Sequence, residues 1–464
     1  MSESIEVPPE VAAGVDTDDD RKEYDQFLQM EGQLREPGGV DEETGWRYEY
    51  WHIAMTRNAR AENRRRLRVY LDPAPHVVLD QNVPLRGWYK AKVERPGARP
   101  RPCYTEALLT QPYGGSCPVR CVFCYVNNGL RGYRGQGVTT VDPDYPLKVL
   151  RQIKRMRTGS AFYISSFTEP FQPGIEAHYH NTQRTAAVAV GAGLPVFFLT
   201  RQTPPGWAVD VVRKNPFSYF QFSINTPRRD HWRRLSPRAA PLDDQVEAIR
   251  ELSRKGVYIS VQVNPIMSGV TTVEEVVTLI HELAQAGAHH LIFKHIEIVS
   301  PAAKQMVKKM HRLFPDRGAD FEALFSETIG SLRTIKEGYR KSALDRYLIE
   351  TRAAGVTMGL CYEYEYGRDE SGKVVDRAGV SLGPKYTTGD QCHGRKVPMF
   401  SRPTVYQPFV RITVCDPGGC LYCADHHGGV DQVPCGTALL GEATALKPRD
   451  YREPAWAKHR LPIR

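Results

Sequence analysis

Gly114 to Val126 read GGSCPVRCVFCYV, and in this stretch Cys117, Cys121 and Cys124 follow one another in a CxxxCxxC spacing. Three thiolates from one compact loop give a cubane iron-sulfur cluster only three protein ligands, whereas ordinary electron-transfer clusters are closed by four. One iron is then open to a ligand or substrate, as open coordination positions are in catalytic metal sites. The stretch therefore predicts a cluster that takes part in chemistry.

The same spacing, with the aromatic Phe123 just before the last cysteine, resembles the signature of the radical S-adenosylmethionine (radical SAM) superfamily. The resemblance implies that the open iron chelates the methionine part of SAM and that an electron cleaves its sulfonium. A 5'-deoxyadenosyl radical would then abstract hydrogen from an organic substrate, while the protein positions and shields the cofactor. It also implies an electron donor such as flavodoxin or ferredoxin. Two alternatives stay open here, a zinc knuckle and a closed four-cysteine cluster with Cys103 as fourth ligand.

The length and composition predict a soluble globular protein. A chain of 464 residues can hold two or three domains. No apolar run approaches the roughly 20 residues of a membrane span, and the acidic N-terminus MSESIEVPPE lacks the basic and apolar regions of a signal peptide. We therefore expect a cytoplasmic location and no membrane partner. In that setting the ten cysteines indicate metal ligands or reactive thiols rather than disulfides.

The net charge of +9 is concentrated in arginine-rich stretches such as Arg57 to Arg68 and Arg228 to Arg238. Nucleic acid, a phosphorylated substrate or an acidic partner would suit such stretches. A basic face covered by water would suit them equally. The net charge alone does not distinguish a binding surface from a solvated face.

Composition divides the chain into five regions. We expect a mobile acidic tail with one short helix around Lys22 to Leu34, an irregular layer rich in Trp, Tyr and Arg, a barrel, a helical cover and a C-terminal cysteine-rich module. Their boundaries are, in order, 1–45, 46–104, 105–300, 301–355 and 356–464.

Short β-branched or aromatic runs alternate with helical patterns in the third region, which predicts βα units and a parallel sheet. The expected strands are Glu106 to Thr110, Ala161 to Ser166, Pro195 to Thr200, Tyr219 to Ile224, Val257 to Val263 and Leu291 to Ile296. The expected helices are Tyr145 to Arg157, Thr182 to Ala192, Leu242 to Arg254 and Val273 to Ala286. Six such units fit an α/β fold with a partial (β/α)6 TIM-type barrel, the core that the superfamily resemblance also implies.

Functional groups of barrels gather at the C-terminal ends of the strands, and polar residues follow the expected strands. By position, the resemblance implies that Ser166, Thr168 and Glu169 contact the amino group of SAM. Ser223 and Asn225 would suit the ribose hydroxyls, Gln262 or Asn264 the ribose or the methionine carboxylate, and Phe123 the adenine. Lys294, His295 and Glu297 are candidates to orient a substrate or transfer protons. Helix and turn capping is the structural alternative for each of them.

Four segments together resemble the spore photoproduct lyase branch of the superfamily. They are CPVRCVFCY, SSFTEPFQPGIE, SINTPRRDHWRRLSPRAAPLDDQVEAIRELSRKG and VYISVQVNPIM, within residues 105–300. True lyases return a hydrogen atom from a cysteine in the loop after the second strand, but residues 165–168 read SSFT. Cys361, after the strand-like VTMGLC, or Tyr125 would be the substitute hydrogen donor. A buried, inert thiol is the alternative for Cys361.

A second group of cysteines lies near the C-terminus in VCDPGGCLYCADHHGGVDQVPCG, where Cys415, Cys420, Cys423 and Cys435 form a Gly/Pro-rich set of soft ligands. The set predicts an auxiliary iron-sulfur cluster, with structural zinc as the alternative. A member could be replaced by another residue of the region, namely Cys361, Cys392, His393, His426 or His427.

These patterns predict a radical SAM enzyme that abstracts hydrogen from a small molecule, nucleoside or peptide. One alternative is a lyase-like enzyme that holds DNA or RNA on its basic surface and takes a flipped base into the barrel. Another is a metal-stabilised nucleic-acid-binding or redox-sensing protein without turnover.

Overall fold

The structure is a computed structural model, and it describes most of the chain between residues 35 and 411. The described residues are 35–54, 64–78, 107–124, 138–154, 156, 158–372, 374–390, 392–395, 397, 400–402, 404 and 406–411. None of the helices formed by these residues is long and apolar enough to cross a membrane.

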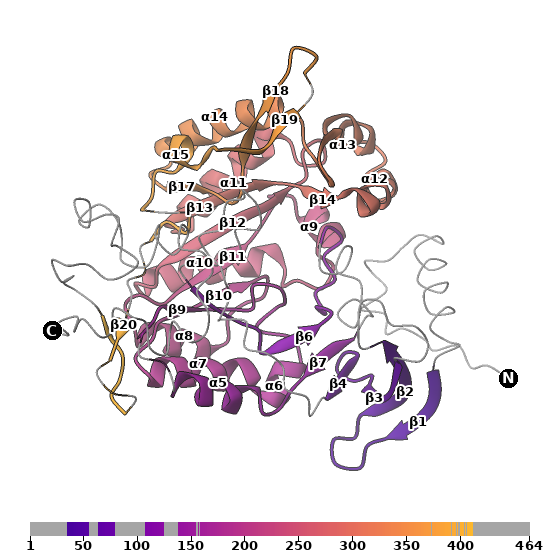
Figure 1. Ribbon diagram of the computed structural model, residues 1–464, viewed down its shortest axis with the longest axis vertical. Helices are drawn as coiled ribbons and strands as arrows, with labels where there is room; N and C mark the ends of the chain where they lie inside the picture. Colours follow the sequence, from indigo (N-terminus) through magenta and orange to yellow (C-terminus); the bar gives the residue numbers. More distant parts are fainter. Residues whose placement is uncertain are drawn as a thin grey trace.

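The core is a seven-stranded sheet in which every neighbouring pair is parallel (Figure 1). From one edge to the other its strands are β17 (Thr357–Leu360), β13 (His290–His295), β12 (Ile259–Ile266), β11 (Tyr219–Ser223), β10 (Val196–Thr200), β9 (Ala161–Ile164) and β5 (Ala107–Thr110). The six expected strands are present. The sheet has a seventh strand, β17, beyond the six units of the expected barrel, because the apolar segment VTMGL pairs in register with β13.

Aromatic side chains distinguish the two faces of this sheet. Phe198 and Phe220 stack on each other, and Phe198 also contacts Trp207 of the covering helix α8 (Gly206–Arg213). The alternate residues therefore point to the barrel interior, since successive side chains of a strand face opposite ways. There Phe197 stacks between Tyr163 and Tyr219, with ring centroids 4.4 and 4.6 Å apart. Each such pair stabilises the fold by about 1 kcal/mol beyond its buried area.

Helices cover the outer face of the sheet (Figure 1). They are α5 (Tyr145–Ile153), α6 (Ile175–Tyr179), α7 (Asn181–Gly191), α8 (Gly206–Arg213), α10 (Leu242–Arg254), α11 (Val273–Gln285) and α14 (Glu337–Ala353). The start of α11 is set by its sequence, because the Thr272 hydroxyl accepts from the Glu275 amide while the Glu275 carboxylate accepts from the Thr272 amide. Such a capping box satisfies two amides that the helix leaves unpaired.

A second, six-stranded sheet adjoins the barrel at the lower right of Figure 1. Its order is β1 (Arg35–Val40), β2 (Arg47–Ala54), β3 (Arg64–Tyr70), β4 (His76–Val78), β7 (Thr139–Val141) and β6 (Tyr113–Gly115). This differs from the expected irregular layer, and β1 lies within the expected tail. The alternation of aromatic and arginine residues in β2 and β3 explains the difference, because Arg66 covers the Tyr50 ring and Arg68 the Tyr48 ring across the pair. The helix expected around 22–34 lies outside the described residues.

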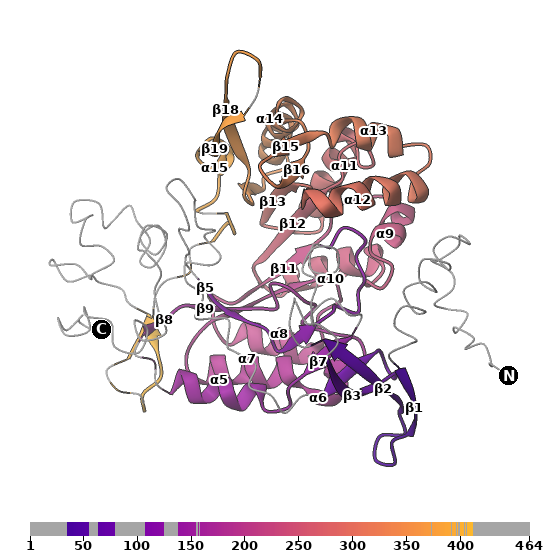
Figure 2. The ribbon, with the colours of Figure 1, turned by 45° about the vertical axis from the view of Figure 1, so that its right-hand side comes forward.

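Smaller elements surround the far edge of the barrel, toward the top of Figures 1 and 2. They are α9 (Arg229–Leu235), β14 (Glu297–Val299), α12 (Ser300–Leu313), α13 (Gly318–Leu324), β15 (Glu327–Ile329), β16 (Leu332–Thr334), β18 (Tyr364–Arg368), β19 (Val374–Ser381) and α15 (Gly383–Tyr386). A three-stranded sheet joins β8 (Thr158–Gly159) to β20 (Phe400–Ser401) and β21 (Val410–Arg411).

Residues 392–395 enter the barrel interior. His393 is buried, lies edge-on to Phe197 and shares a 3.1 Å hydrogen bond between its Nδ1 and the Gln221 amide. His290 of β13 holds the same segment through the Cys392 carbonyl oxygen, 2.9 Å from its Nε2. These contacts fill the interior below the C-terminal strand ends and leave those ends to form the mouth of the barrel.

Candidate functional site

The three cysteines of the CxxxCxxC stretch lie on a loop that follows β6. The loop contains tight turns, with the Arg120 amide donating to the Cys117 carbonyl and the Cys124 amide to the Cys121 carbonyl. The Val122 amide donates to the Leu235 carbonyl at the end of α9, which fixes the loop against the barrel. All three thiols are free of disulfides.

The thiols lie close enough to influence one another. Burial raises the pKa of the Cys117 thiol, and the neighbouring Cys121, Glu169 and Cys124 raise it further because two adjacent negative charges repel. The Ser236 hydroxyl lies 3.4 Å from the Cys121 sulfur, within hydrogen-bonding distance for sulfur. A buried group of like charges needs a positive counter-charge nearby.

That counter-charge is Arg201, directly after β10. Its guanidinium donates to the Ser236 hydroxyl at 3.2 Å, the Ser223 hydroxyl at 2.9 Å and the Asn264 carbonyl at 3.0 Å. Burial lowers the pKa of Arg201, while the charges of the three cysteines and Glu169 act against that lowering. The guanidinium carbon is also 4.9 Å from the centre of the Phe123 ring. Arg201 therefore connects the cluster loop to three strand ends.

Glu169 joins the loop after β9 to the end of β10. Its carboxylate accepts from the Thr200 hydroxyl at 2.6 Å, the Arg201 amide at 2.9 Å and the Phe171 amide at 3.1 Å. Burial raises the pKa of Glu169 to about 7, although these hydrogen bonds oppose the shift. These hydrogen bonds hold the Glu169 side chain and tie the loop after β9 to the end of the neighbouring parallel strand β10.

Ser166 and Thr168 are held by Gln111, the residue after β5. With its amide oxygen toward Ser166, Gln111 accepts from the Ser166 amide at 2.9 Å and from its hydroxyl at 2.8 Å, and donates to the Thr168 hydroxyl at 3.3 Å. This orientation is assigned from the hydrogen-bond network. Ser165, which precedes them, has a φ of +62°, a conformation that non-glycine residues adopt at a cost of about 1 kcal/mol or more. The loop after β9 is therefore held against the end of β5 by Gln111.

Interior residues form a row across three neighbouring strands, and most of the polar ones bond to one another. Ser223, Gln262 and Ile292 are in register across β11, β12 and β13, and the Gln262 amide donates to Gln221 at 2.8 Å while its oxygen accepts from Asn264 at 3.2 Å. Asn225 is fully buried and donates to the Pro265 carbonyl at 3.0 Å. The residues expected at the fourth and fifth strand ends are thus brought together beside Arg201.

Comparison with known proteins tests which family this site belongs to. The sequence model of the Radical SAM superfamily matches residues 112–288, which include the three cysteines and strands β9 to β12. The "Radical SAM Nalpha-GlyT isomerase" of Pseudomonas phage M6 is 41% identical over 445 residues, covering 93% of this chain and 92% of that protein. The chain belongs to the radical SAM superfamily. It is therefore an enzyme.

Comparison with solved structures gives partial matches with low TM-scores. A spore photoproduct lyase complexed with dinucleoside spore photoproduct has a TM-score of 0.40 and 17% identity, covering 54% of this chain and 74% of its own. SuiB of Streptococcus suis has a TM-score of 0.36 and 12% identity, covering 56% and 50%.

The residues of this radical SAM enzyme fit a [4Fe-4S] cluster and SAM. Cys117, Cys121 and Cys124 would hold the cluster with three soft thiolates, and the buried Arg201 would supply the cation that a negatively charged cluster needs beside it. When bound, the cluster and SAM supply reductive sulfonium cleavage and hydrogen abstraction from an unactivated C–H bond. The protein holds the loop through Val122, keeps Phe123 buried against Arg201, and excludes water with the apolar side chains around Phe123.

Arg201 and Gln111 were not singled out from the radical SAM sequence. Each directly follows a strand, β10 and β5 respectively, so the rule that functional groups follow barrel strands applies to both. The expected site residues come from the second, fourth, fifth and sixth strand ends, whereas Gln111 and Arg201 follow the first and the third. Gln221, in the middle of the apolar run YFQFS, was a further signal, since a buried polar side chain needs partners.

Some expected site residues are not described by the structure, and one described residue, His295, faces away from the barrel mouth. Tyr125, Cys103 and the four cysteines of the C-terminal set are outside the described residues. Cys361 follows β17 at the barrel mouth, and its amide donates to the Phe293 carbonyl at 3.0 Å. His295 is buried with its ring stacked on Tyr347 of α14, so it faces the helix layer and not the mouth.

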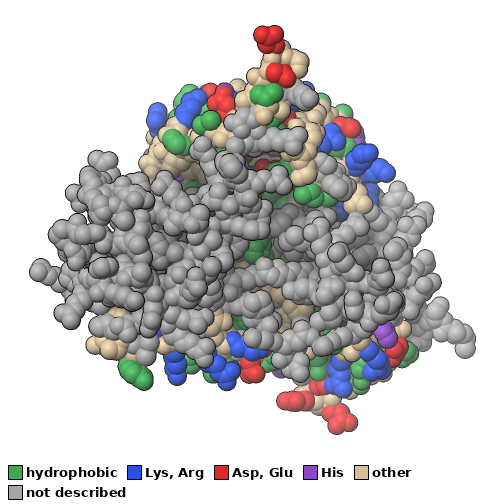
Figure 3. Space-filling view, viewed as in Figure 1, with side chains coloured by type: hydrophobic (Ala, Val, Ile, Leu, Met, Phe, Trp, Pro, Cys, Tyr) green, Lys and Arg blue, Asp and Glu red, His purple; other side chains and the backbone are tan. Residues whose placement is uncertain are grey.

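Four arginines in the described parts of the arginine-rich stretches are ion-paired. Arg66 pairs with Glu36, Arg68 with Asp41, Arg228 with Asp230, and Arg229 with Asp243 and Glu282. On the face in Figure 3, described side chains of both signs are interspersed. These pairs reduce the positive charge that the described stretches offer to a polyanion.

Proposed function

We propose that this radical SAM enzyme is an isomerase that acts on the same substrate as its relative, Nalpha-GlyT. The observation that supports this is 41% identity across more than nine tenths of both chains. Such coverage includes every strand end of the barrel as well as the cluster loop. An isomer has the composition of its substrate, so the hydrogen atom that is removed has to be replaced.

Incubation with SAM, a reductant and Nalpha-GlyT under anaerobic conditions tests the proposal. We expect an isomer of equal mass that separates from the substrate on chromatography. A product of different mass, or 5'-deoxyadenosine without any change in Nalpha-GlyT, contradicts the isomerase assignment while leaving the superfamily intact.

We further propose that Cys361 gives a hydrogen atom to the product radical, and that the thiyl radical left on Cys361 takes up an electron from the reductant and a proton from solvent. Its position directly after β17, with its amide bonded to the Phe293 carbonyl of the neighbouring strand β13, supports this. A thiol proton exchanges with solvent, so product formed in D2O gains one deuterium if a protein thiol donates. Return of the original hydrogen atom adds none. Cys361→Ala would then form 5'-deoxyadenosine without isomer, and Tyr125→Phe, which removes the other expected donor, would retain the reaction.

The C-terminal set of Cys415, Cys420, Cys423 and Cys435 is proposed to bind a second iron-sulfur cluster. Flavodoxin or ferredoxin is the proposed electron donor. Iron and sulfide analysis of Cys420→Ala tests the cluster, and we expect about half the metal of the parent protein if both clusters are cubanes. An unchanged iron content would rule out a cluster at these cysteines.

A further inference from the structure

The end of β13 presents alternate side chains to two different environments. Phe293 and His295 both stack on Tyr347 of α14, with ring centroids 5.1 and 6.5 Å apart, so they face the helix layer. The residues between them face the opposite way. Ile292 is in register with Gln262 in the interior row, and Lys294 follows it on the same face at the barrel mouth.

Lys294 has a loosely held partner of opposite charge. Its Nζ lies 3.4 Å from the Glu297 carboxylate and 3.3 Å from the Tyr362 carbonyl oxygen. Both distances exceed the usual range of roughly 2.7 to 3.2 Å, and an ammonium has three donors. The two charged side chains are only 12% and 17% exposed. A cation and an anion thus lie side by side, partly removed from water, with hydrogen-bonding capacity that their mutual contact leaves unused.

The backbone beside them is strained. Tyr362 has a φ of +65°, in the left-handed region that bulky residues avoid. Arg120 in the cluster loop and Ser165 after β9 have similar values, +55° and +62°. Such strain persists only where the surrounding structure imposes it, and it gathers at binding sites. At Tyr362 the strained conformation accompanies the contact of its carbonyl oxygen with Lys294.

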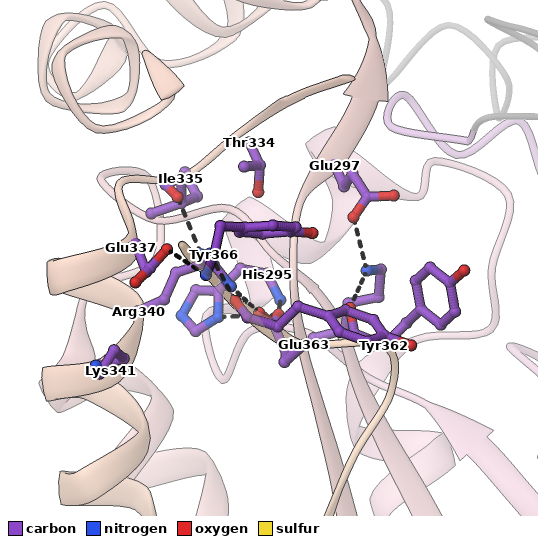
Figure 4. Close-up of polar contacts among 12 residues, drawn as sticks. His295, Glu297, Thr334, Ile335, Glu337, Arg340, Lys341, Tyr362, Glu363 and Tyr366 are labelled. Atoms are coloured by element: carbon purple, nitrogen blue, oxygen red, sulfur yellow. Dashed lines mark hydrogen bonds and ion pairs between the residues drawn. The ribbon is translucent and has the colours of Figure 1, made fainter. Parts of the chain in front are cut away.

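A buried ionic group imposes this arrangement (Figure 4). Glu363, the residue after Tyr362, accepts from the His295 amide at 2.7 Å and pairs with Arg340 of α14. Burial by itself would raise the pKa of Glu363, but the hydrogen bond from His295 and the charge of Arg340 hold it well below its usual range. Because His295 and Glu363 are the chain neighbours of Lys294 and Tyr362, this bond fixes the two residues that face the mouth.

We propose that Lys294 and Glu297 bind an α-amino acid group of the substrate, with its carboxylate on Lys294 and its amino group on Glu297. The Tyr362 carbonyl is a second acceptor for the amino group. A group with both charges replaces one long ion pair by two shorter charge-assisted hydrogen bonds. A phosphate would be repelled by Glu297, and an apolar group would leave the remaining hydrogen-bonding capacity of both side chains unused. The proposal rests on the function proposed for this barrel mouth and specifies the chemistry recognised there.

Glycine is the probe that tests it, because it is the smallest molecule with both groups. Binding of 13C-labelled glycine to the full-length protein, loaded with cluster and SAM, is followed by NMR titration, with acetate and methylammonium as single-charge comparators. The variants are Lys294→Met, Glu297→Gln and Lys294→Arg. Lys341→Met is the matched control, since Lys341 pairs with Glu365 on the outer side of α14.

We expect glycine to bind more tightly than either comparator. Loss of one charge-assisted bond is expected to weaken binding by about tenfold in Lys294→Met and in Glu297→Gln. Lys294→Arg and Lys341→Met are expected to bind glycine as the parent does. Equal binding by Lys294→Met and the parent, or no glycine binding by the parent, overturns the proposal.

Formation of 5'-deoxyadenosine without substrate distinguishes a failure of the amino acid site from a failure of the proposed isomerase function. If the parent and Lys294→Met both form it, the cofactor site is intact and a change in glycine binding reports on Lys294 itself. If glycine binds as expected but Nalpha-GlyT is not isomerised, the proposed function fails and the amino acid site stands.

Discussion

Replacement of Arg201 by methionine should make the iron-sulfur cluster harder to reduce. Reduction adds a negative charge to the cluster, and the buried guanidinium stabilises that charge. In the variant Arg201→Met the cation is removed while a side chain of similar length still fills the space against Phe123. The reduced state then loses more stabilisation than the oxidised state does, so the reduction potential falls.

The magnitude follows from two contacts. The guanidinium lies 3.2 Å from the Ser236 hydroxyl, which lies 3.4 Å from the Cys121 sulfur, so charge and sulfur are within about 7 Å. At that distance, and at an effective dielectric constant of about 20, two unit charges interact by about 2 kcal/mol. For one electron this corresponds to a decrease of about 100 mV.

Spectroelectrochemical titration of the reconstituted cluster without SAM measures the effect. Arg346→Met is the control, because Arg346 is 55% exposed and pairs with Glu350 on the surface of α14. Arg201→Lys keeps the charge and should restore most of the potential. An Arg201→Met potential equal to that of the control would refute the reasoning, and so would an Arg201→Lys potential as low as that of Arg201→Met.

Three further outcomes are expected. Cys121→Ala should lose the iron of the first cluster and all formation of 5'-deoxyadenosine, because only two thiolates of the loop remain. Iron analysis measures the first loss and chromatography the second. Retention of both would contradict the assignment of Cys121 as a cluster ligand. Burial lowers the pKa of His290 from 6.5 to about 4, so the folded state binds fewer protons than the unfolded state between these pH values. The free energy of unfolding should therefore fall by up to about 3 kcal/mol as the pH falls through this range. Denaturant unfolding of the parent and of His290→Gln at several pH values should show this difference, and parallel pH profiles would exclude it. Tyr362→Gly should have a free energy of unfolding about 1 kcal/mol higher than Tyr362→Ala, because glycine tolerates a φ of +65°. Denaturant unfolding measures this, and an equal or lower midpoint for the glycine variant would argue against strain.

The sequence by itself determined the cluster loop and the parallel sheet. Both are local properties, since the spacing of Cys117, Cys121 and Cys124 lies within eight residues and the alternation of apolar runs with helical patterns is read segment by segment. The polar residues at the strand ends followed from the same periodicity. These features need no knowledge of which distant segments meet.

The tertiary structure alone decided which strand-end residues act together. Arg201 meets Ser223, Ser236 and Asn264, and Glu363 meets His295 from 68 residues away along the chain. The direction of a side chain at the end of a strand depends on register, because a shift of one residue exchanges the interior and outer faces. Register is set by pairing across the sheet. For that reason the sequence could name Lys294 and His295 together, and only the fold could place one at the barrel mouth and the other against α14.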